Sequence, residues 1–225
     1  MLFDFLPRPH AEITAGIAHL PGWLGIGQQA ALVQDFRQIA RSVARTPMAM
    51  TRPVLKSGGQ MSVHTLNLGY FFDRETYRYV ETYDGLRVPP LPEALSELAH
   101  AGLAAASEVS EDLRPWVSSY RPQMALVNFY SSASSMGLHV DAYEDCAAPI
   151  VSLSIGEEAL FRMGGTANRN KPWDDITLCS GDLVVFGGPK RFAYHGVPRV
   201  NAGTAPAGCG LSEGRINVTI RQIND

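Results

Sequence analysis

"RINVTIRQI", residues 215–223, alternates between apolar and polar side chains. Apolar residues occupy every second position, and hydrogen-bonding residues, two of them arginines, occupy the positions between. The apolar set is Ile216, Val218 and Ile220, and the polar set is Arg215, Asn217, Thr219 and Arg221. Because successive side chains of a strand point to opposite faces, the pattern predicts a β-strand with one apolar and one polar face. A solvated polar face is the simpler interpretation of a lone strand, and a polar cavity is the alternative.

Other short β-type runs precede this segment from about residue 120, separated by Gly, Ser, Pro and Asp. They are residues 124–130, 149–155, 159–163, 175–179, 182–188 and 192–197. Closely spaced strands with turn signals predict an antiparallel sandwich or jelly roll. Helical periodicity appears earlier, over residues 26–43 and again after Pro92. We therefore predict an α+β fold in which the amino-terminal helices pack on the outside of one sheet.

The composition predicts an ordinary globular protein. The chain has 225 residues, 45% of them hydrophobic and 18% charged, which suits one domain over residues 1–225. The net charge of −3 supplies no global basic field, so nucleic-acid binding would need a local basic patch. Three scattered cysteines and the absence of a long apolar run, including in the amino-terminal "MLFDFLPRPH", lead us to expect a cytoplasmic protein with no membrane segment. We expect a monomer.

A candidate metal site begins in "GLHVDAYED", residues 137–145, where His139 and Asp141 are two positions apart and share a face if the segment is a strand. His195 is the candidate third ligand. Two histidines and one carboxylate on one face of an octahedral ion leave three positions open, as in non-haem Fe(II) oxygenases. The pattern alone is weak, because histidines are common and a buried hydrogen-bonded pair has the same spacing. We interpret the remaining histidines as structural or surface residues: His10, His19, His64 and His100.

The arginines of residues 215–221 fit a charged co-substrate. Fe(II) with two neutral imidazoles and Asp141 carries a net charge of +1, which a chelating keto acid neutralises. If that acid is 2-oxoglutarate, its second carboxylate still needs a cation. An arginine is suited to it, because it stays charged and binds a carboxylate through two hydrogen bonds. Arg215 and Arg221 are the candidates.

These residues resemble the bacterial AlkB-type Fe(II)/2-oxoglutarate dioxygenases, which repair alkylated nucleic acid. The resemblance covers about three quarters of the chain, from "GGQMSV" at Gly58 to the carboxyl end. It rests on motifs that occur in order and at compatible spacings: "NFY", "LHVDAYE", "APIVSLSIG", "FRMGG", "GDLVVFGG", "YHGV" and "RINVTIRQ". The resemblance implies a double-stranded β-helix core over about residues 120–225 and a nucleotide-recognition lid over about residues 50–90.

The resemblance also assigns roles to residues. It implies that His139, Asp141 and His195 are the iron ligands. The implied 2-oxoglutarate contacts are Asn128, Tyr130, Arg215, Asn217 and Arg221, with Arg215 at the far carboxylate. The implied reaction hydroxylates an N-methyl group of a base such as 1-methyladenine or 3-methylcytosine, in DNA or RNA and most readily in single-stranded DNA. O2 and 2-oxoglutarate are consumed, and succinate, CO2 and formaldehyde are released.

Substrate contacts are expected in an aromatic stretch, residues 70–83, and in two later loops. A sheet face packed on the first helix is the alternative for the aromatic stretch. The expected contacts are Tyr70, Tyr77, Arg78, Tyr79, Tyr143, Glu144 and Arg169. Three of these positions depart from the family pattern. Tyr70 replaces a stacking tryptophan, Tyr143 replaces a base-contacting aspartate, and the substrate-loop arginine is shifted by one position, from Asn168 to Arg169.

Other interpretations remain open at this stage. The same iron chemistry could act on a protein, a lipid or a small metabolite, as the altered pocket and the acidic net charge allow. A cupin-like protein that binds a metal and a dicarboxylate without turnover is a third possibility, against which the complete ligand set argues. Lys190 and Arg191, in "GGPKRFAYH", are either phosphate contacts or part of a solvated turn.

Overall fold

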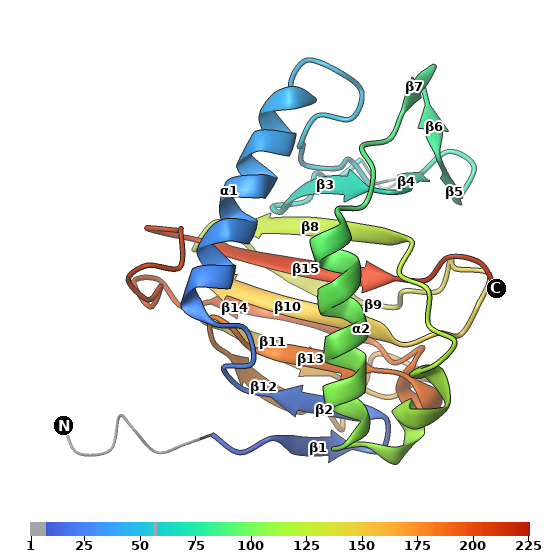
Figure 1. Ribbon diagram of the computed structural model, residues 1–225, viewed down its shortest axis with the longest axis vertical. Helices are drawn as coiled ribbons and strands as arrows, with labels where there is room; N and C mark the ends of the chain where they lie inside the picture. The colour runs from blue at the N-terminus through green and yellow to red at the C-terminus, as the bar shows by residue number, and fades with distance from the viewer. Residues whose placement is uncertain (1–7, 56–57) are drawn as a thin grey trace.

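Two antiparallel sheets lie face to face in the computed structural model, which describes residues 8–55 and 58–225 (Figure 1). Most of the amino-terminal stretch "MLFDFLPRPH" lies outside the described residues. The larger sheet has seven strands in the order β1-β2-β13-β10-β15-β8-β3. Their bounds are β1 Ala11–Thr14, β2 Ile17–Leu20, β13 Leu183–Phe186, β10 Ile150–Gly156, β15 Arg215–Arg221, β8 Met124–Tyr130 and β3 His64–Leu68.

The smaller sheet has four strands in the order β12-β11-β14-β9. Their bounds are β12 Asp174–Leu178, β11 Ala159–Met163, β14 His195–Val200 and β9 Met136–His139. From β8 onward the chain crosses repeatedly between the two sheets, and only β11 and β12 follow each other in the same sheet. This is the connectivity of a jelly roll, in which strands distant in sequence become neighbours.

The α+β class with antiparallel sheets is confirmed. Residues 124–130 and 159–163 coincide with β8 and β11, and the last run begins with β15 at Arg215. The run predicted over residues 192–197 is wrong at its start: β14 begins only at His195, because Arg191 and Phe192 form a turn after the short 3-10 helix Gly188–Lys190. The sequence analysis also missed β1, β2 and β3, which extend both ends of the larger sheet. β1 and β2 are short and lack strict alternation, whereas β3 alternates Thr65 and Asn67 with Leu66 and Leu68 over only five residues.

The alternation in β15 gives the larger sheet two different faces, one apolar and one partly polar. Ile216, Val218 and Ile220 join an apolar cluster that also contains buried residues of both long helices. The alternate residues of the strand face the space between the two sheets, where they line a cavity. A second apolar cluster, which includes Ile150 and Phe161, fills the rest of that space. The sheet therefore has one largely apolar face and one face that is polar around the cavity.

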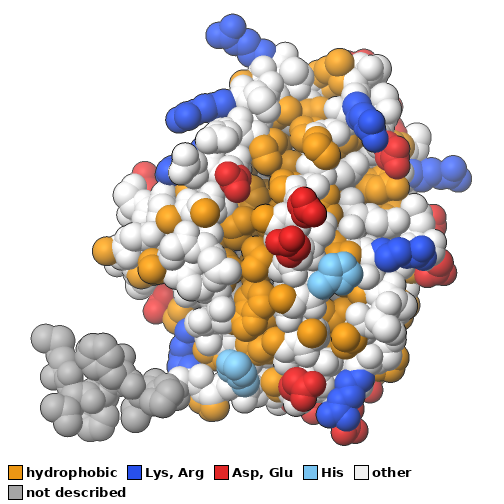
Figure 2. All heavy atoms as spheres, in the orientation of Figure 1, with side chains coloured by type: hydrophobic (Ala, Val, Ile, Leu, Met, Phe, Trp, Pro, Cys, Tyr) orange, Lys and Arg blue, Asp and Glu red, His pale blue; other side chains and the backbone are white. Residues whose placement is uncertain are grey.

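The two long helices are α1, Ile26–Ser42, and α2, Glu93–Ser107. Leu95, Ala99 and Leu103 of α2 are buried with Leu32 and Phe36 of α1 in the apolar cluster on the larger sheet. Figure 1 shows both helices in front of this sheet. In the same orientation, Figure 2 shows Lys and Arg side chains around the edge of this face and apolar surface near its centre. The basic side chains on this face are thus dispersed.

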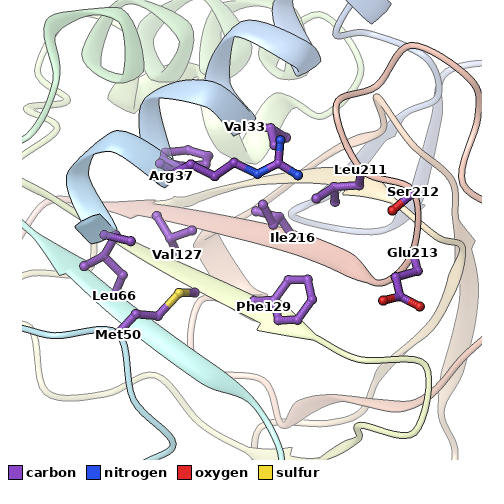
Figure 3. A pocket seen from close by; sticks show the side chains of 12 residues that line it. Val33, Arg37, Met50, Leu66, Val127, Phe129, Leu211, Ser212, Glu213 and Ile216 are labelled. Atoms are coloured by element: carbon purple, nitrogen blue, oxygen red, sulfur yellow. The ribbon is translucent and has the colours of Figure 1, made fainter. Parts of the chain in front are cut away.

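A shallow apolar hollow of about 300 Å³ remains beside α1 (Figure 3). Val33 and Arg37 of α1 lie over it, and Val127, Phe129 and Ile216 form its floor. Val127 and Phe129 alternate along β8 with Asn128 and Tyr130, which face the other side of the sheet. The hollow and the polar cavity are therefore separated by the sheet.

Two small ribbons follow β3. Strands β4, Phe71–Asp73, and β5, Arg78–Val80, form the first, which we call the aromatic hairpin (residues 71–80). Strands β6, Thr82–Tyr83, and β7, Leu86–Arg87, form the second. Gly69 precedes the aromatic hairpin with a φ of 80°, and a Cβ atom there would collide with the carbonyl oxygen of Gln123. Only glycine allows the chain to enter the aromatic hairpin so close to β8. The structure also has the short 3-10 helix Glu111–Trp116.

No described helix is long and apolar enough to cross a membrane. The three cysteines, Cys146, Cys179 and Cys209, are all free.

Asp182 anchors the amino-terminal strands at one end of the larger sheet. Its side chain is 0% exposed and accepts two hydrogen bonds from Arg8, at 2.7 and 2.6 Å, and one from His19 Nε2 at 2.9 Å. The backbone N–H groups of Gly22 and Cys179 also donate to it. Burial alone would raise the pKa of Asp182, but these donors outweigh burial and hold the pKa below its usual value.

Asp182→Asn should lower the free energy of unfolding at pH 7 by about 2–3 kcal/mol, because the buried carboxylate is replaced while its donors remain. The lowered pKa means that the carboxylate stabilises the fold above pH ~4, and that this contribution is lost as the pH falls through the folded-state pKa. Urea unfolding of both proteins at pH 7 and below pH 4 should therefore show a difference that shrinks in acid. An equal difference at both pH values would contradict the proposed role of the charge.

Candidate metal centre and its cavity

His139, Asp141 and His195 meet at one end of the space between the sheets. Their ligand atoms all lie within 4.8 Å of one another, and they are the one such group of histidine, cysteine or acidic residues among the described residues. His139 ends β9 and His195 begins β14, where the two residues are register partners. Asp141 lies two residues beyond the end of β9, so the irregular segment that follows the strand brings it to the histidines.

The histidines present the nitrogens that a metal needs. Nδ1 of His139 lies 3.0 Å from the carbonyl oxygen of Gly137, and Nδ1 of His195 lies 3.0 Å from that of Ala193. These carbonyls favour the tautomer in which Nδ1 carries the proton, which leaves Nε2 as the free donor. The two Nε2 atoms lie 3.7 and 3.4 Å from carboxylate oxygens of Asp141. All three donor groups therefore converge.

The protonation states also suit metal binding. Burial lowers the pKa of His139, and the neighbouring His195 lowers it further, although 36% of the His139 side chain is exposed. Burial would raise the pKa of Asp141, but Arg221 and the two histidines outweigh burial and hold the pKa well below its usual value. A neutral imidazole and an ionised carboxylate are the forms that bind a divalent metal.

The three residues line a cavity of about 870 Å³ that opens to the surface. This volume lies in the upper part of the range for small-molecule sites. The expected co-substrate contacts all line it: Asn128, Tyr130, Arg215, Asn217 and Arg221. The polar face of β15 is thus turned inward, which decides between the two interpretations that the sequence left open.

Arg215 is a buried cation without a carboxylate partner among the described residues. It is 1% exposed, its Nη2 donates to Ser154 Oγ at 3.0 Å, and its guanidinium lies 5.3 Å from the centre of the Tyr130 ring. Its Nε and Nη1 have no hydrogen-bond partner within the described chain, and neither has Asn128 Oδ1. Unpaired donors in a buried cavity are costly unless a ligand satisfies them. An anionic ligand fits this end of the cavity.

Arg221 is paired within the chain. Its Nη2 donates to Asp141 Oδ2 at 2.6 Å, and its Nη1 donates to Glu144 Oε1 at 2.9 Å and to the Tyr79 hydroxyl at 2.9 Å. Burial lowers the pKa of Arg221, but Asp141 and the groups around it outweigh burial and raise the pKa. The two arginines of β15 therefore have different electrostatic surroundings, although they lie on the same face.

The mouth of the cavity is aromatic and basic. Tyr143, 48% exposed, contacts the rings of Phe72 and Tyr77 at centroid distances of 4.9 and 5.4 Å. Arg169 lies 5.7 Å from the ring centre of Tyr194, and both residues line the cavity. Aromatic faces and cations around an opening can bind a planar base and its phosphate.

The structure separates the expected substrate contacts into three groups. Tyr79, Tyr143 and Arg169 line the cavity. Tyr70, Tyr77 and Arg78 are not among the lining residues; Tyr70 donates to Glu81 at 3.1 Å, and Arg78 is exposed on the aromatic hairpin.

Glu144 lies behind the cavity wall. Its side chain is 0% exposed, and both of its oxygens accept hydrogen bonds from other side chains. In this arrangement it has no surface to offer a base.

Both interpretations of Arg191 were wrong. It is neither a phosphate contact nor part of a solvated turn, because it is 1% exposed and donates to Glu144 Oε2 at 3.0 Å. It also donates to the backbone oxygens of Asp141 and Ala148. Lys190 donates to the carbonyl oxygen of Gly164 at 3.2 Å. Nothing in "GGPKRFAYH" signals this, because the partners of Arg191 lie more than 40 residues away.

Other residues that line or support the cavity were not predicted from the sequence. Ser152 and Ser154, on β10, hold Asn217 and Arg215 by hydrogen bonds of 2.8 and 3.0 Å. Their alternation with Val151 and Leu153 along a single run was a detectable signal, of the same kind as in β15. Arg74, in the aromatic stretch, also lines the cavity, although the sequence analysis did not name it.

Comparisons with known proteins agree with this geometry. The profile of the 2OG-Fe(II) oxygenase superfamily matches residues 16–221. The alpha-ketoglutarate-dependent dioxygenase AlkB homolog of Caulobacter vibrioides is 33% identical over 217 residues, which cover 93% of this chain and 89% of that protein. The alpha-ketoglutarate-dependent dioxygenase AlkB of Escherichia coli is 32% identical over 198 residues, or 85% of this chain and 83% of that protein.

Plant proteins are similar as well. The DNA N(6)-methyladenine demethylase ALKBH1C of Arabidopsis thaliana is 30% identical over 227 residues; the match covers 93% of this chain, which spans about half (49%) of that protein. The solved structure of OsALKBH1 superimposes with a TM-score of 0.79 at 27% identity, covering 95% of this chain and 100% of that one.

His139→Ala should strongly weaken the binding of Fe(II) or Co(II), because it removes a ligand atom. Loss of a residue that only hydrogen-bonds to a ligand lowers metal affinity roughly 10–100-fold, and the loss of the ligand itself should lower it further. Calorimetric titration of the metal-free protein measures this directly. His10→Ala, at an exposed histidine, is the matched control and should bind the metal like the unchanged protein. Equal affinities for both variants would refute the assignment of this cluster as the metal site.

Proposed function

The chain belongs to the AlkB family of Fe(II)/2-oxoglutarate-dependent dioxygenases, and we propose that it demethylates N-alkylated bases in nucleic acid. The proposed substrates are of the 1-methyladenine and 3-methylcytosine type, in DNA or RNA, with single-stranded DNA preferred. One observation carries this proposal: the cavity that contains His139, Asp141 and His195 opens between aromatic rings and arginines. The names of the relatives, which include DNA and tRNA demethylases, support it.

His139, Asp141 and His195 would hold the iron through Nε2, a carboxylate oxygen and Nε2. The bound Fe(II), with O2 and 2-oxoglutarate, supplies the oxidising chemistry that transfers one oxygen atom to the methyl carbon and yields succinate and CO2. The carbonyls of Gly137 and Ala193 keep both imidazoles in the required orientation. The chain thus needs to hold the reacting groups in register, and its side chains need not take part in the oxidation.

Arg215 would bind the far carboxylate of 2-oxoglutarate with its free Nε or Nη1 group. Nε and Nη1 lie on different edges of the guanidinium, so one of them, together with Nη2, would form the pair of parallel N–H donors that matches the two oxygens of a carboxylate. Tyr130, whose ring lies against Arg215, and the two amides, Asn128 and Asn217, would contact the rest of the co-substrate. Arg221 would lie beside its other end, next to Asp141.

The base would enter between Phe72 and Tyr143 on one side and Tyr194 on the other, with its methyl group towards the metal ligands. Residues 50–90, including the aromatic hairpin, would act as a nucleotide-recognition lid on the core formed by residues 120–225, and the helices would support the core from outside. Tyr70 and Tyr77 would stack bases at the surface, and Arg78 would contact phosphate. Once the methyl carbon is hydroxylated, the carbon–nitrogen bond breaks to give formaldehyde and the free base.

A direct test uses the protein reconstituted with Fe(II) and a single-stranded oligonucleotide that contains 1-methyladenine or 3-methylcytosine. Mass spectrometry should show methyl loss and succinate in equal amounts. Succinate without methyl loss would contradict the proposed substrate and favour a protein, lipid or metabolite substrate. His139→Ala should give neither product.

Arg215→Ala should raise the KM for 2-oxoglutarate more than it lowers kcat, because it removes the binding partner of the far carboxylate. The loss of a bidentate charged contact predicts an increase of about 10–100-fold. Steady-state rates over a range of 2-oxoglutarate concentrations measure it. An unchanged KM would mean that another cation binds this carboxylate.

Arg74→Gln should weaken oligonucleotide binding and lower its salt dependence by about one ion, because Arg74 lines the cavity and has no carboxylate partner among the described residues. Fluorescence anisotropy over a range of salt concentrations measures both effects. Arg78→Gln is the matched comparison on the same hairpin, outside the cavity lining, and should change binding less. If Arg78→Gln weakens oligonucleotide binding more than Arg74→Gln does, Arg78 makes the main phosphate contact.

A further inference from the structure

Glu144 stands at the centre of a buried group of charges next to the metal cluster. Its Oε1 accepts from Tyr79 and from Arg221, each at 2.9 Å, and its Oε2 accepts from Arg191 at 3.0 Å. The side chain is fully buried. Burial would raise the pKa of Glu144, but the two arginines outweigh burial and lower the pKa. The residue is therefore an ionised carboxylate whose oxygens are all engaged.

Arg191 fixes Glu144 from behind. Its three nitrogens donate to three different acceptors, two of which are backbone oxygens, of Asp141 and Ala148, at 2.7 and 2.6 Å. A planar guanidinium bonded on all sides has a single orientation. Arg191 consequently joins Glu144 to the backbone of Asp141, which is itself in the metal cluster.

Arg221 bridges Glu144 and the metal cluster from the front. One of its terminal nitrogens bonds to Glu144, and the other bonds to Asp141 Oδ2 at 2.6 Å. Because the guanidinium is rigid, the position of Glu144 determines the angle at which Arg221 meets Asp141. The carboxylates of Asp141 and Glu144 balance the charges of Arg191 and Arg221, so the group is neutral as a whole.

Tyr79 extends this group to the aromatic hairpin. Its hydroxyl donates to Glu144 and accepts from Arg221, and its ring lies 5.2 Å from the ring of Phe72. Tyr79 belongs to β5, which lies in the segment that we propose as the lid. A displacement of this segment would break both hydrogen bonds of the hydroxyl.

We propose that Glu144 is a positioning residue: held by Arg191, it orients Arg221 against Asp141 and connects the aromatic hairpin to this pair through Tyr79. It therefore acts on the co-substrate and the metal through Arg221, and it does not contact the base. The inference rests on the proposed function only for the metal and co-substrate roles of Asp141 and Arg221.

The test is the affinity for 2-oxoglutarate of the anaerobic Fe(II) protein, followed by the visible charge-transfer absorption of the complex. Glu144→Gln should weaken binding about tenfold or more and shift the absorption maximum, since outer hydrogen-bond partners of ligating carboxylates have effects of this size. Tyr79→Phe removes one hydroxyl and leaves all four charges paired, so a smaller loss of about three- to tenfold is expected.

Tyr83→Phe is the matched control, because it removes a hydroxyl from the neighbouring ribbon, where the Tyr83 ring stacks on Phe71 at 4.2 Å. It should leave both the affinity and the absorption maximum unchanged. If Glu144→Gln does not fold, Tyr79→Phe decides the matter. Identical results for Tyr79→Phe and Tyr83→Phe would overturn the proposal. The experiment contains no nucleic acid, so a failure of the proposed substrate would not alter its outcome.

Discussion

The burial of two arginines on one face of β15 constrains the rest of this structure. A guanidinium between two sheets loses its hydration, and only anionic or strongly polar partners offset that loss. Arg221 has such partners in Asp141 and Glu144, whereas Arg215 has a hydroxyl and an aromatic ring. The interior is therefore neutral at one end and positively charged at the other. The positively charged end suits one carboxylate of a dicarboxylic acid, and a divalent metal held at the other end would accept the second, which matches the co-substrate of the family.

The opposite face of β15 explains why the polar cavity does not destabilise the fold. Its apolar side chains pack with both long helices and with the neighbouring strands in one continuous cluster. Since the strand lies in the middle of the larger sheet, hydrogen-bonded on both edges to β8 and β10, its arginines have little freedom to move. The same residues that form the core thus hold the charged groups in position.

The proposed sites of chemistry and of substrate recognition occupy different parts of the molecule. The metal cluster and the proposed co-substrate contacts come from β8, β9, β14 and β15 and the irregular segment after β9, whereas the cavity mouth comes from the aromatic hairpin and loops. Loops tolerate substitution better than central strands. This agrees with the departures from the family pattern at Tyr70, Tyr143 and Arg169, which all lie outside the regular strands of the core. Glu144 and Tyr79 are where the two parts meet.

The sequence by itself determined the class of fold, the two long helices, the faces of β8 and β15, and the three residues of the metal cluster. It could do so because alternation and helical spacing are local patterns that survive without knowledge of tertiary contacts. It did not determine which face of β15 was inside, the strands β1 to β3, or the roles of Arg191 and Glu144. Those depend on partners far away in the sequence, such as Asp141 for Arg221, 80 residues earlier, and on which charges end up buried together. Only the tertiary structure decides them, because the free energy of a charge depends on the dielectric and on the neighbours that folding brings to it.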